Sequence, residues 1–176
     1  QALKISSRRI TLSTAGVIAG IRRLAREDRL IKLAVSLNAT DEETRRRIMP
    51  IARANPLDAL LEACRDFQDQ SPKRHRVTFE YVLLAGLNDT PEDARRLVRL
   101  LSAIPCKINL IPFNPAPGLP FERPAPEVVE EFQNYLQNKN FVVAVRYSKG
   151  RDVSAACGQL ALGREQEACN EPDRQV

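Results

Sequence analysis

The feature that most constrains the fold is a regular alternation of strand-like and helix-like segments. Short apolar runs rich in β-branched residues are each followed by a polar turn and an amphipathic stretch. Five strands are predicted, over residues 9–13, 32–37, 76–84, 107–111 and 141–145. Strands that alternate with helices run parallel, because each helix carries the chain back to the end of the sheet where the previous strand began.

Helices are predicted after each of the first four strands, and several begin with clear signals. Their expected ranges are about 15–27, 42–47, 57–67, 91–101 and 126–137. Thr14 is a candidate N-cap of the first helix, and Pro56 and Pro91 suit first-turn positions. The fold class is therefore α/β. The pattern leaves open whether the sheet is doubly wound or part of a β/α barrel.

The charge distribution suggests a polyanionic partner. The chain has 27 basic and 22 acidic residues, and the excess is concentrated in residues 1–32 and 139–151. Basic clusters bind phosphates and release counterions from nucleic acid. The alternative is an ordinary solvated surface rich in arginine. The absence of G-x-G-x-x-G and P-loop motifs leaves dinucleotide and P-loop nucleotide binding without a sequence signal.

The length and hydropathy point to one compact unit or a piece of a longer protein. The 176 residues suit a single domain, and the first residue is glutamine instead of an initiating methionine. Apolar stretches are far shorter than the ~20 residues that span a bilayer, and no signal segment opens the chain. A location in the cytoplasm, without membrane association, is expected.

The four cysteines are too widely spaced to form a local metal or redox motif. They are Cys64, Cys106, Cys157 and Cys169, and no two lie within four residues of each other. The single histidine, His75, cannot complete a metal site with one of them, so no metal ligands are assigned. Cys64 and Cys106 suit small positions in the core.

Cys157 differs from the other cysteines in its surroundings. It lies among small residues in the run 154–159, which would allow another molecule to approach the sulfur. The nearby Arg146, Lys149 and Arg151 would favour the thiolate, so Cys157 is a candidate nucleophile. The alternative is a small residue that fills space among alanines.

Polar residues follow several of the predicted strands, where parallel α/β folds bind ligands. They are Ser13, Ser36 to Asn38, Asn114 and the loop 148–157. Together they would suit a small polar cofactor with ribose and amino-acid groups. Each has a structural alternative, because Ser13 can cap a helix, Asn38 can form an Asx-turn and Asn114 can brace its loop.

Four runs resemble the carboxyl-terminal portion of the radical S-adenosylmethionine (SAM) RNA adenine-C2 methyltransferases, the RlmN-like enzymes with Cfr as a related branch. The runs are Arg8–Gly16, Leu33–Ala39, Lys107–Pro115 and Ala155–Leu160. The resemblance extends to about residue 165, and the motifs occur in the family's order. It implies that residues 1–160 are the second half of a partial β/α barrel and that residues 161–176 form a flexible tail.

The resemblance implies specific site residues. In the family, the corresponding positions bind SAM, which assigns Ser13, Ser36, Leu37, Asn38 and Asn114 to the cofactor. Asn38 replaces the family's usual histidine, and its amide can still donate and accept hydrogen bonds. The family's methyl-carrying cysteine corresponds to Cys157.

The resemblance also implies chemistry and partners. Carbon 2 of adenine is a poor nucleophile, so the family methylates it by a radical route through a methylated cysteine, with a [4Fe-4S] cluster as a second cofactor. The expected substrate is 23S rRNA, with tRNA as a candidate second substrate, and an electron donor and a monomeric enzyme are expected.

The family's cluster-binding cysteines have no counterpart in this chain, and neither do its resolving cysteine and proton-accepting glutamate. The chain is therefore expected to be inactive in isolation. The alternative to an enzyme fragment is a non-catalytic α/β RNA-binding module with inert cysteines.

Overall fold

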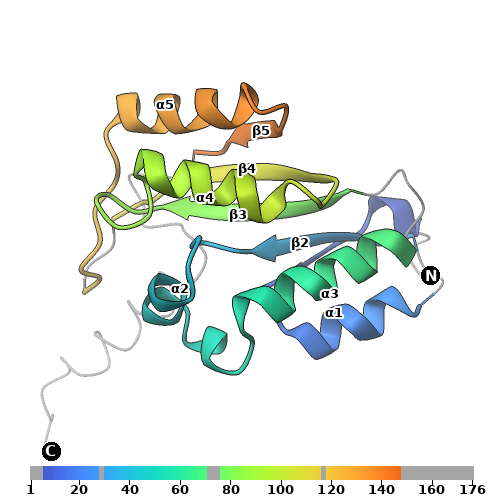
Figure 1. Cartoon of the computed structure of the whole chain (residues 1–176). Coiled ribbons are helices and arrows are strands. Elements are labelled where there is room, and N and C mark those ends of the chain that lie inside the picture. The colour runs from blue at the N-terminus through green and yellow to red at the C-terminus, as the bar shows by residue number, and fades with distance from the viewer. Residues whose placement is uncertain (1–5, 28–29, 71–75, 116–117, 148–176) are drawn as a thin grey trace, which may run out of the picture.

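The computed structural model describes residues 6–27, 30–70, 76–115 and 118–147. These residues form one sheet in which each neighbouring pair of strands is parallel (Figure 1). The strands are β1 (Thr11–Thr14), β2 (Lys32–Ser36), β3 (Val77–Leu83), β4 (Cys106–Pro112) and β5 (Val142–Val145). The predicted α/β class with parallel strands is confirmed.

Helices connect the strands in the described part of the chain. They are α1 (Ile18–Ala25), α2 (Glu42–Ile48), α3 (Leu57–Gln70), α4 (Pro91–Leu101) and α5 (Pro126–Gln137). Two short 3₁₀ helices, η1 (Ser7–Arg9) and η2 (Pro50–Arg53), were not predicted. The start of α4 follows its sequence signals, because Thr90 and Asp93 form a capping box around Pro91. None of the helices in the described ranges is long and apolar enough to cross a bilayer.

The prediction of Thr14 as the N-cap of the first helix is wrong. The helix begins at Ile18, and Val17 occupies the N-cap position. The Thr14 hydroxyl instead accepts hydrogen bonds from the N–H groups of Gly16 and Val17, at 3.1 and 3.2 Å. Gly16 has a φ of 103°, which a helix cannot contain. The Ile18 N–H donates to Asn55 Oδ1 at 2.9 Å, so a distant side chain satisfies this helix end.

The strand order decides between the two α/β architectures that the sequence left open. The spatial order is β1-β2-β3-β4-β5, identical to the order along the chain. A doubly wound sheet reverses its order at a switch point, whereas a β/α barrel adds each strand beside the preceding one. The sheet is therefore arranged like a part of a β/α barrel.

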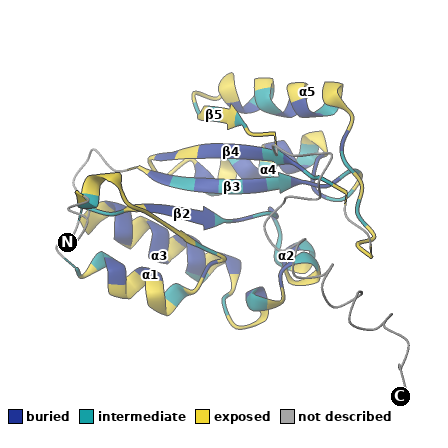
Figure 2. Ribbon diagram, turned by 180° about the vertical axis from the view of Figure 1, so that it is seen from behind, coloured by how far each residue is buried: buried dark blue, intermediate teal, exposed yellow. Residues whose placement is uncertain are grey.

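The two faces of the sheet differ in what covers them. Helices α1, α3, α4 and α5 lie in front of the sheet in Figure 1 and behind it in Figure 2. Strand β3 shows the consequence, because Val77, Phe79, Tyr81 and Leu83 are buried and the residues between them are half-buried. No helix of the described residues covers the opposite face, which we call the open face.

Candidate functional site

Three polar side chains form a row across the open face. Ser36 at the end of β2 is in register with Glu80 of β3, and Glu80 is in register with Asn109 of β4. Since adjacent strand residues point to opposite faces, all three lie opposite the buried apolar residues. Ser36 and Glu80 are half-buried and Asn109 is 8% exposed. Glu80 and Asn109 were not predicted as site residues.

Ser13 extends this row onto the edge strand β1. Its backbone is in register with Ala34, which lies two residues before Ser36 and therefore on the same face. Its hydroxyl lies 3.5 Å from Glu80 Oε2, longer than a strong O–H···O hydrogen bond. The structure thus brings two of the predicted cofactor-binding residues, Ser13 and Ser36, to the same face as Glu80.

Leu37 does not offer its side chain to this face. The side chain is fully buried among the core residues, as expected from its position next to Ser36 in an extended segment. Its N–H donates to the Glu80 carbonyl at 2.9 Å. Any contact of Leu37 with a cofactor would therefore use backbone atoms.

The side chain of Asn38 is already engaged within the protein. Its Oδ1 accepts a hydrogen bond from the Val82 N–H at 3.0 Å, and its Nδ2 lies 3.5 Å from Met49 Sδ. The backbone of Asn38 has a φ of 58°, a conformation that asparagine tolerates better than most residues. Asn38 therefore connects the end of β2 to β3, and the second N–H of its Nδ2 makes no hydrogen bond within the described residues.

A buried asparagine, Asn88, fixes the backbone of Asn38 through a hydrogen bond. Its Nδ2 donates to the carbonyl oxygens of Asn38 and Val82, at 2.8 and 2.7 Å. Its Oδ1 accepts from the Leu84 N–H at 2.7 Å, and its own carbonyl accepts from the Tyr81 hydroxyl at 2.9 Å. These bonds use both donors of the Asn88 amide and fix the backbone at the carboxyl ends of β2 and β3.

Asn114 also has a partner inside the protein. It follows β4, and its Oδ1 accepts from the Arg123 guanidinium at 2.9 Å. Arg123 donates a second bond to the Phe113 carbonyl at 2.7 Å. This supports the structural alternative for Asn114, because Arg123 holds both residues in the loop. Nδ2 of Asn114 makes no hydrogen bond within the described residues and is available to a ligand.

The loop that follows Ser13 is held by Arg45 of α2. This arginine is fully buried and donates to the carbonyls of Asn55 and Ala15, at 2.8 and 3.3 Å. Desolvation by burial lowers the pKa of its guanidinium, and the nearby Glu42 opposes that effect. Since arginine remains charged at neutral pH, the β1–α1 loop lies against a fixed positive charge.

The described cysteines are structural, as predicted. Cys64 of α3 and Cys106 of β4 are buried in the core on the helix side of the sheet. Burial raises the pKa of each thiol to about 12, so neither forms a thiolate at neutral pH. Cys157, Lys149 and residues 161–176 lie outside the described residues.

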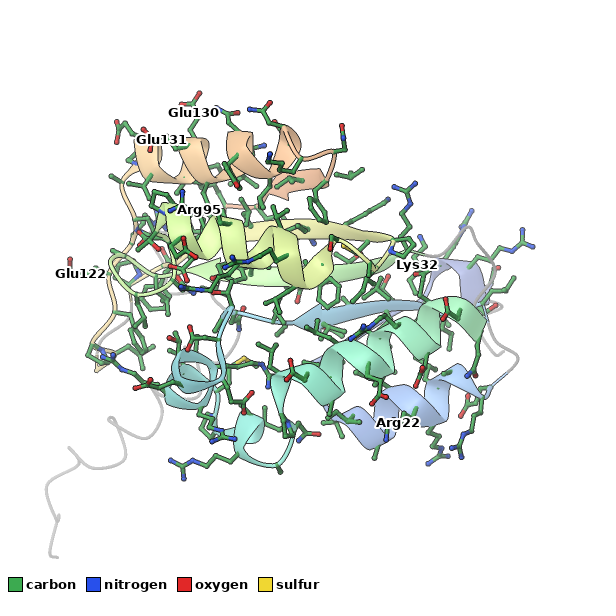
Figure 3. All side chains as sticks on the ribbon, viewed as in Figure 1. Arg22, Lys32, Arg95, Glu122, Glu130 and Glu131 are labelled. Atoms are coloured by element: carbon green, nitrogen blue, oxygen red, sulfur yellow. The ribbon has the colours of Figure 1, made fainter. Side chains whose placement is uncertain are left out.

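Arginines from the basic amino-terminal stretch border an open groove beside α1. Arg22, Arg23 and Arg26 contribute to this groove, whose volume is about 840 Å³. Arg22 pairs with Glu62 at 3.1 Å and Arg23 approaches Glu27 at 3.8 Å, but the Arg23 side chain remains 86% exposed. Figure 3 shows Arg22 extending outward from α1, on the helix side of the sheet. We call this hollow, together with the three arginines that border it, the arginine groove.

The open face carries polar groups that suit a small polar ligand. Hydroxyl, carboxylate and amide groups suit a ribose and an amino-acid moiety, and Ser36 Oγ and the Asn109 amide make no side-chain hydrogen bond within the described residues. The same residues do not suit an iron–sulfur cluster. No group of three metal-ligating side chains occurs in the described ranges, and both described thiols are buried.

Glu80 and Asn109 were not predicted, because ligand-binding residues of parallel α/β folds are expected after the carboxyl ends of the strands. Both lie inside strands, in the register row of Ser36 and on the same face of the sheet. The available signal was a charged residue within a strand of otherwise uncharged residues, Val77–Leu83. A half-buried charge in a central strand needs a partner, so such a residue is a site candidate.

The chain is similar to RNA methyltransferases over most of its length. It is 56% identical over 158 residues to the dual-specificity RNA methyltransferase RlmN of Geobacter sulfurreducens, and 50% identical over 159 residues to that of Desulfotalea psychrophila. Each match covers 90% of this chain and 43% of the relative. The chain therefore spans less than half the length of these curated relatives. No family model matches the chain.

Solved structures show the same relationship. A radical SAM methyltransferase from Sphaerobacter thermophilus matches with a TM-score of 0.83 and 46% identity, over 88% of this chain and 45% of that chain. A domain of a pyruvate-formate lyase-activating enzyme from Bacteroides vulgatus matches with a TM-score of 0.60 at 14% identity, over 77% of this chain and 80% of that domain, which shows a shared fold alone. The resemblance found in the sequence is confirmed.

Proposed function

We propose that this chain is part of a radical SAM RNA methyltransferase and contributes the second half of its catalytic barrel. The observation that carries the proposal is the 56% identity over 158 residues to an RNA methyltransferase. The barrel-like strand order and the polar open face support it independently. Residues 1–160 form this half in the proposal, and residues 161–176 are a tail.

In this proposal the open face binds SAM. Ser13 and Ser36 contact it through their hydroxyls, Leu37 through its backbone, and Asn114 through its free Nδ2. Asn38 shapes the site through its Oδ1, which accepts from Val82, and contacts SAM through the second N–H of its Nδ2. SAM supplies the methyl group when bound. The [4Fe-4S] cluster of such enzymes has no ligands among the described residues and would be held elsewhere in the full-length protein.

Cys157 is the proposed methyl carrier, and carbon 2 of adenine in 23S rRNA is the proposed acceptor. Small neighbours and adjacent basic residues suit a cysteine that must ionise and meet both cofactor and substrate. Modification of tRNA, an electron donor, a monomeric state and a cytoplasmic location remain predictions.

The test is substitution of Cys157 in the full-length protein. Cys157→Ala should abolish methyl transfer to 23S rRNA, and mass spectrometry should find a methyl group on Cys157 of the wild-type protein. Cys169→Ala is the matched control and should retain activity. The 176-residue chain alone should transfer no methyl group, because its sequence has none of the family's closely spaced cluster-binding cysteines. Methylation that persists in Cys157→Ala would show that the carrier is wrongly assigned.

The arginine groove supports a second candidate, a non-catalytic RNA-binding module. Exposed guanidinium groups beside α1 can bind phosphates without any chemistry at sulfur. The two candidates differ at Cys157, since a binding module would carry no methyl group there and would tolerate its substitution.

A further inference from the structure

We propose that Glu80 is a further cofactor-binding residue, whose carboxylate accepts hydrogen bonds from the ribose hydroxyls of the adenosyl cofactor. This inference rests on the proposed function and adds a residue to its site. The position of Glu80 is the first observation. It occupies the middle of β3, which has β2 on one side and β4 on the other. A carboxylate placed there, half-buried, is costly without a partner.

The second observation is that the protein leaves this carboxylate almost unpartnered. Within the described residues its side chain has one hydrogen-bond contact, the 3.5 Å approach of the Ser13 hydroxyl, and no salt bridge. An ionised carboxylate can accept about four hydrogen bonds. Most of the acceptor capacity of Glu80 is therefore available to a ligand on the open face.

The third observation is the arrangement around Glu80. Ser36 and Asn109 lie beside it in register, and their side chains make no hydrogen bond within the described residues. Small residues border the row, because Ala34 precedes Ser36 on the same face and Ala144 is in register with Asn109. Free polar groups with alanines beside them leave room for a polar ligand close to the sheet.

The chemistry of the row identifies the part of the cofactor that it suits. A carboxylate only accepts hydrogen bonds, so it pairs with groups that donate. Adjacent ribose hydroxyls can both donate to one carboxylate, and dinucleotide-binding folds use an acidic residue in this way. The ammonium group of the methionine part is the other donor, and the experiment separates the two.

The test compares Glu80→Gln with wild type in the full-length protein by equilibrium dialysis. The probes are S-adenosylhomocysteine and 5′-methylthioadenosine, which keeps the ribose and lacks the amino-acid part. Because the variant removes a charged acceptor, we expect both probes to bind about 10- to 100-fold more weakly. The control is Glu130→Gln on the outer surface of α5 (Figure 3), which should bind as wild type does. Thermal unfolding should be similar for both variants.

The outcomes distinguish the two proposals. Unchanged affinity of Glu80→Gln for both probes would overturn the role of Glu80 and leave the proposed function standing. A loss confined to S-adenosylhomocysteine would overturn the ribose assignment, because the missing contact would then be to the amino-acid part. Failure of the wild-type protein to bind either probe would overturn the proposed function, and the assignment of Glu80 with it.

Discussion

At the scale of single residues, Asn38 shows how a motif position can have a structural purpose. The resemblance assigns it to the cofactor, yet its amide bonds to Val82 and its carbonyl to Asn88. An asparagine suits this position because it accepts a backbone N–H and tolerates a φ of 58°. It therefore shapes the end of β2, and direct binding through its second amide N–H stays a prediction.

We expect Asn38→Ala to destabilise the full-length protein by about 1–3 kcal/mol, because the Val82 N–H would lose its acceptor. Urea denaturation measures this change. Asn38→Gly is the matched variant, since it also loses the acceptor but accommodates the positive φ, and it should be less destabilised than Asn38→Ala. If Asn38→Ala retained full stability but lost SAM affinity, Asn38 would be a direct ligand.

At the scale of elements, the β1–α1 connection depends on packing against α2 and α3. Gly16 lies in this loop with a φ of 103°. A Cβ at that position would lie 2.7 Å from a guanidinium nitrogen of Arg45 and 3.1 Å from Leu60 Cδ2. Arg45 cannot easily move away, because it is fully buried and bonded to two carbonyl groups. Glycine is therefore required at position 16 both by the backbone conformation of the loop and by the close approach of Arg45 and Leu60.

Gly16→Ala should destabilise the protein by about 1–3 kcal/mol through the strained backbone alone. Gly20→Ala in α1 is the matched control. Its new Cβ would meet Val17 Cγ1 at an ordinary 3.7 Å, and alanine favours the helix by about 0.5–1 kcal/mol. Thermal unfolding should therefore shift in opposite directions for the two variants. A stabilised Gly16→Ala would show that the loop does not need its conformation.

At the scale of the whole molecule, the arginine groove and the proposed cofactor site lie on different surfaces. The arginine groove borders α1, whereas the polar row lies on the open face across the sheet. The exposed carboxylates of Glu130 and Glu131 extend from α5, at the other side of the molecule from Arg22 (Figure 3). A polyanion would therefore be drawn toward the α1 side, away from α5.

Charge reversal in the arginine groove should weaken RNA binding. In the double variant Arg22→Glu, Arg23→Glu, the affinity of the full-length protein for a 23S rRNA fragment should fall. The plot of log K against the logarithm of the salt concentration should become less steep, its slope changing by about 2. Filter binding between 50 and 200 mM salt measures both, because loss of two phosphate contacts should reduce the salt effect on affinity over that range by about 10-fold.

The control for this experiment is Arg95→Glu with Arg99→Glu on α4. These arginines are also exposed and paired, both with Glu92, so the control breaks comparable ion pairs. It should leave the salt dependence of binding unchanged. An unchanged slope in the Arg22 and Arg23 variant would show that the groove does not contact RNA.

The sequence alone determined most of the secondary structure and the direction of the strands. Periodicity, proline positions and capping residues act locally, so the bounds of β3, α4 and α5 could be predicted closely. The buried state of Cys64 and Cys106 followed from the same patterns. Motif residues also indicated Ser13 and Ser36, both of which reach the open face.

Only the tertiary structure decided which hydrogen-bonding groups of these residues remain free for a ligand. Register across three strands places Glu80 beside Ser36 and Asn109, and register depends on pairing between segments far apart in sequence. Likewise, the Oδ1 of Asn38 is not free for a ligand, because it accepts a hydrogen bond from the N–H of Val82 in β3. Local sequence specifies which groups a residue carries, whereas long-range packing determines which of those groups remain free to bind a ligand.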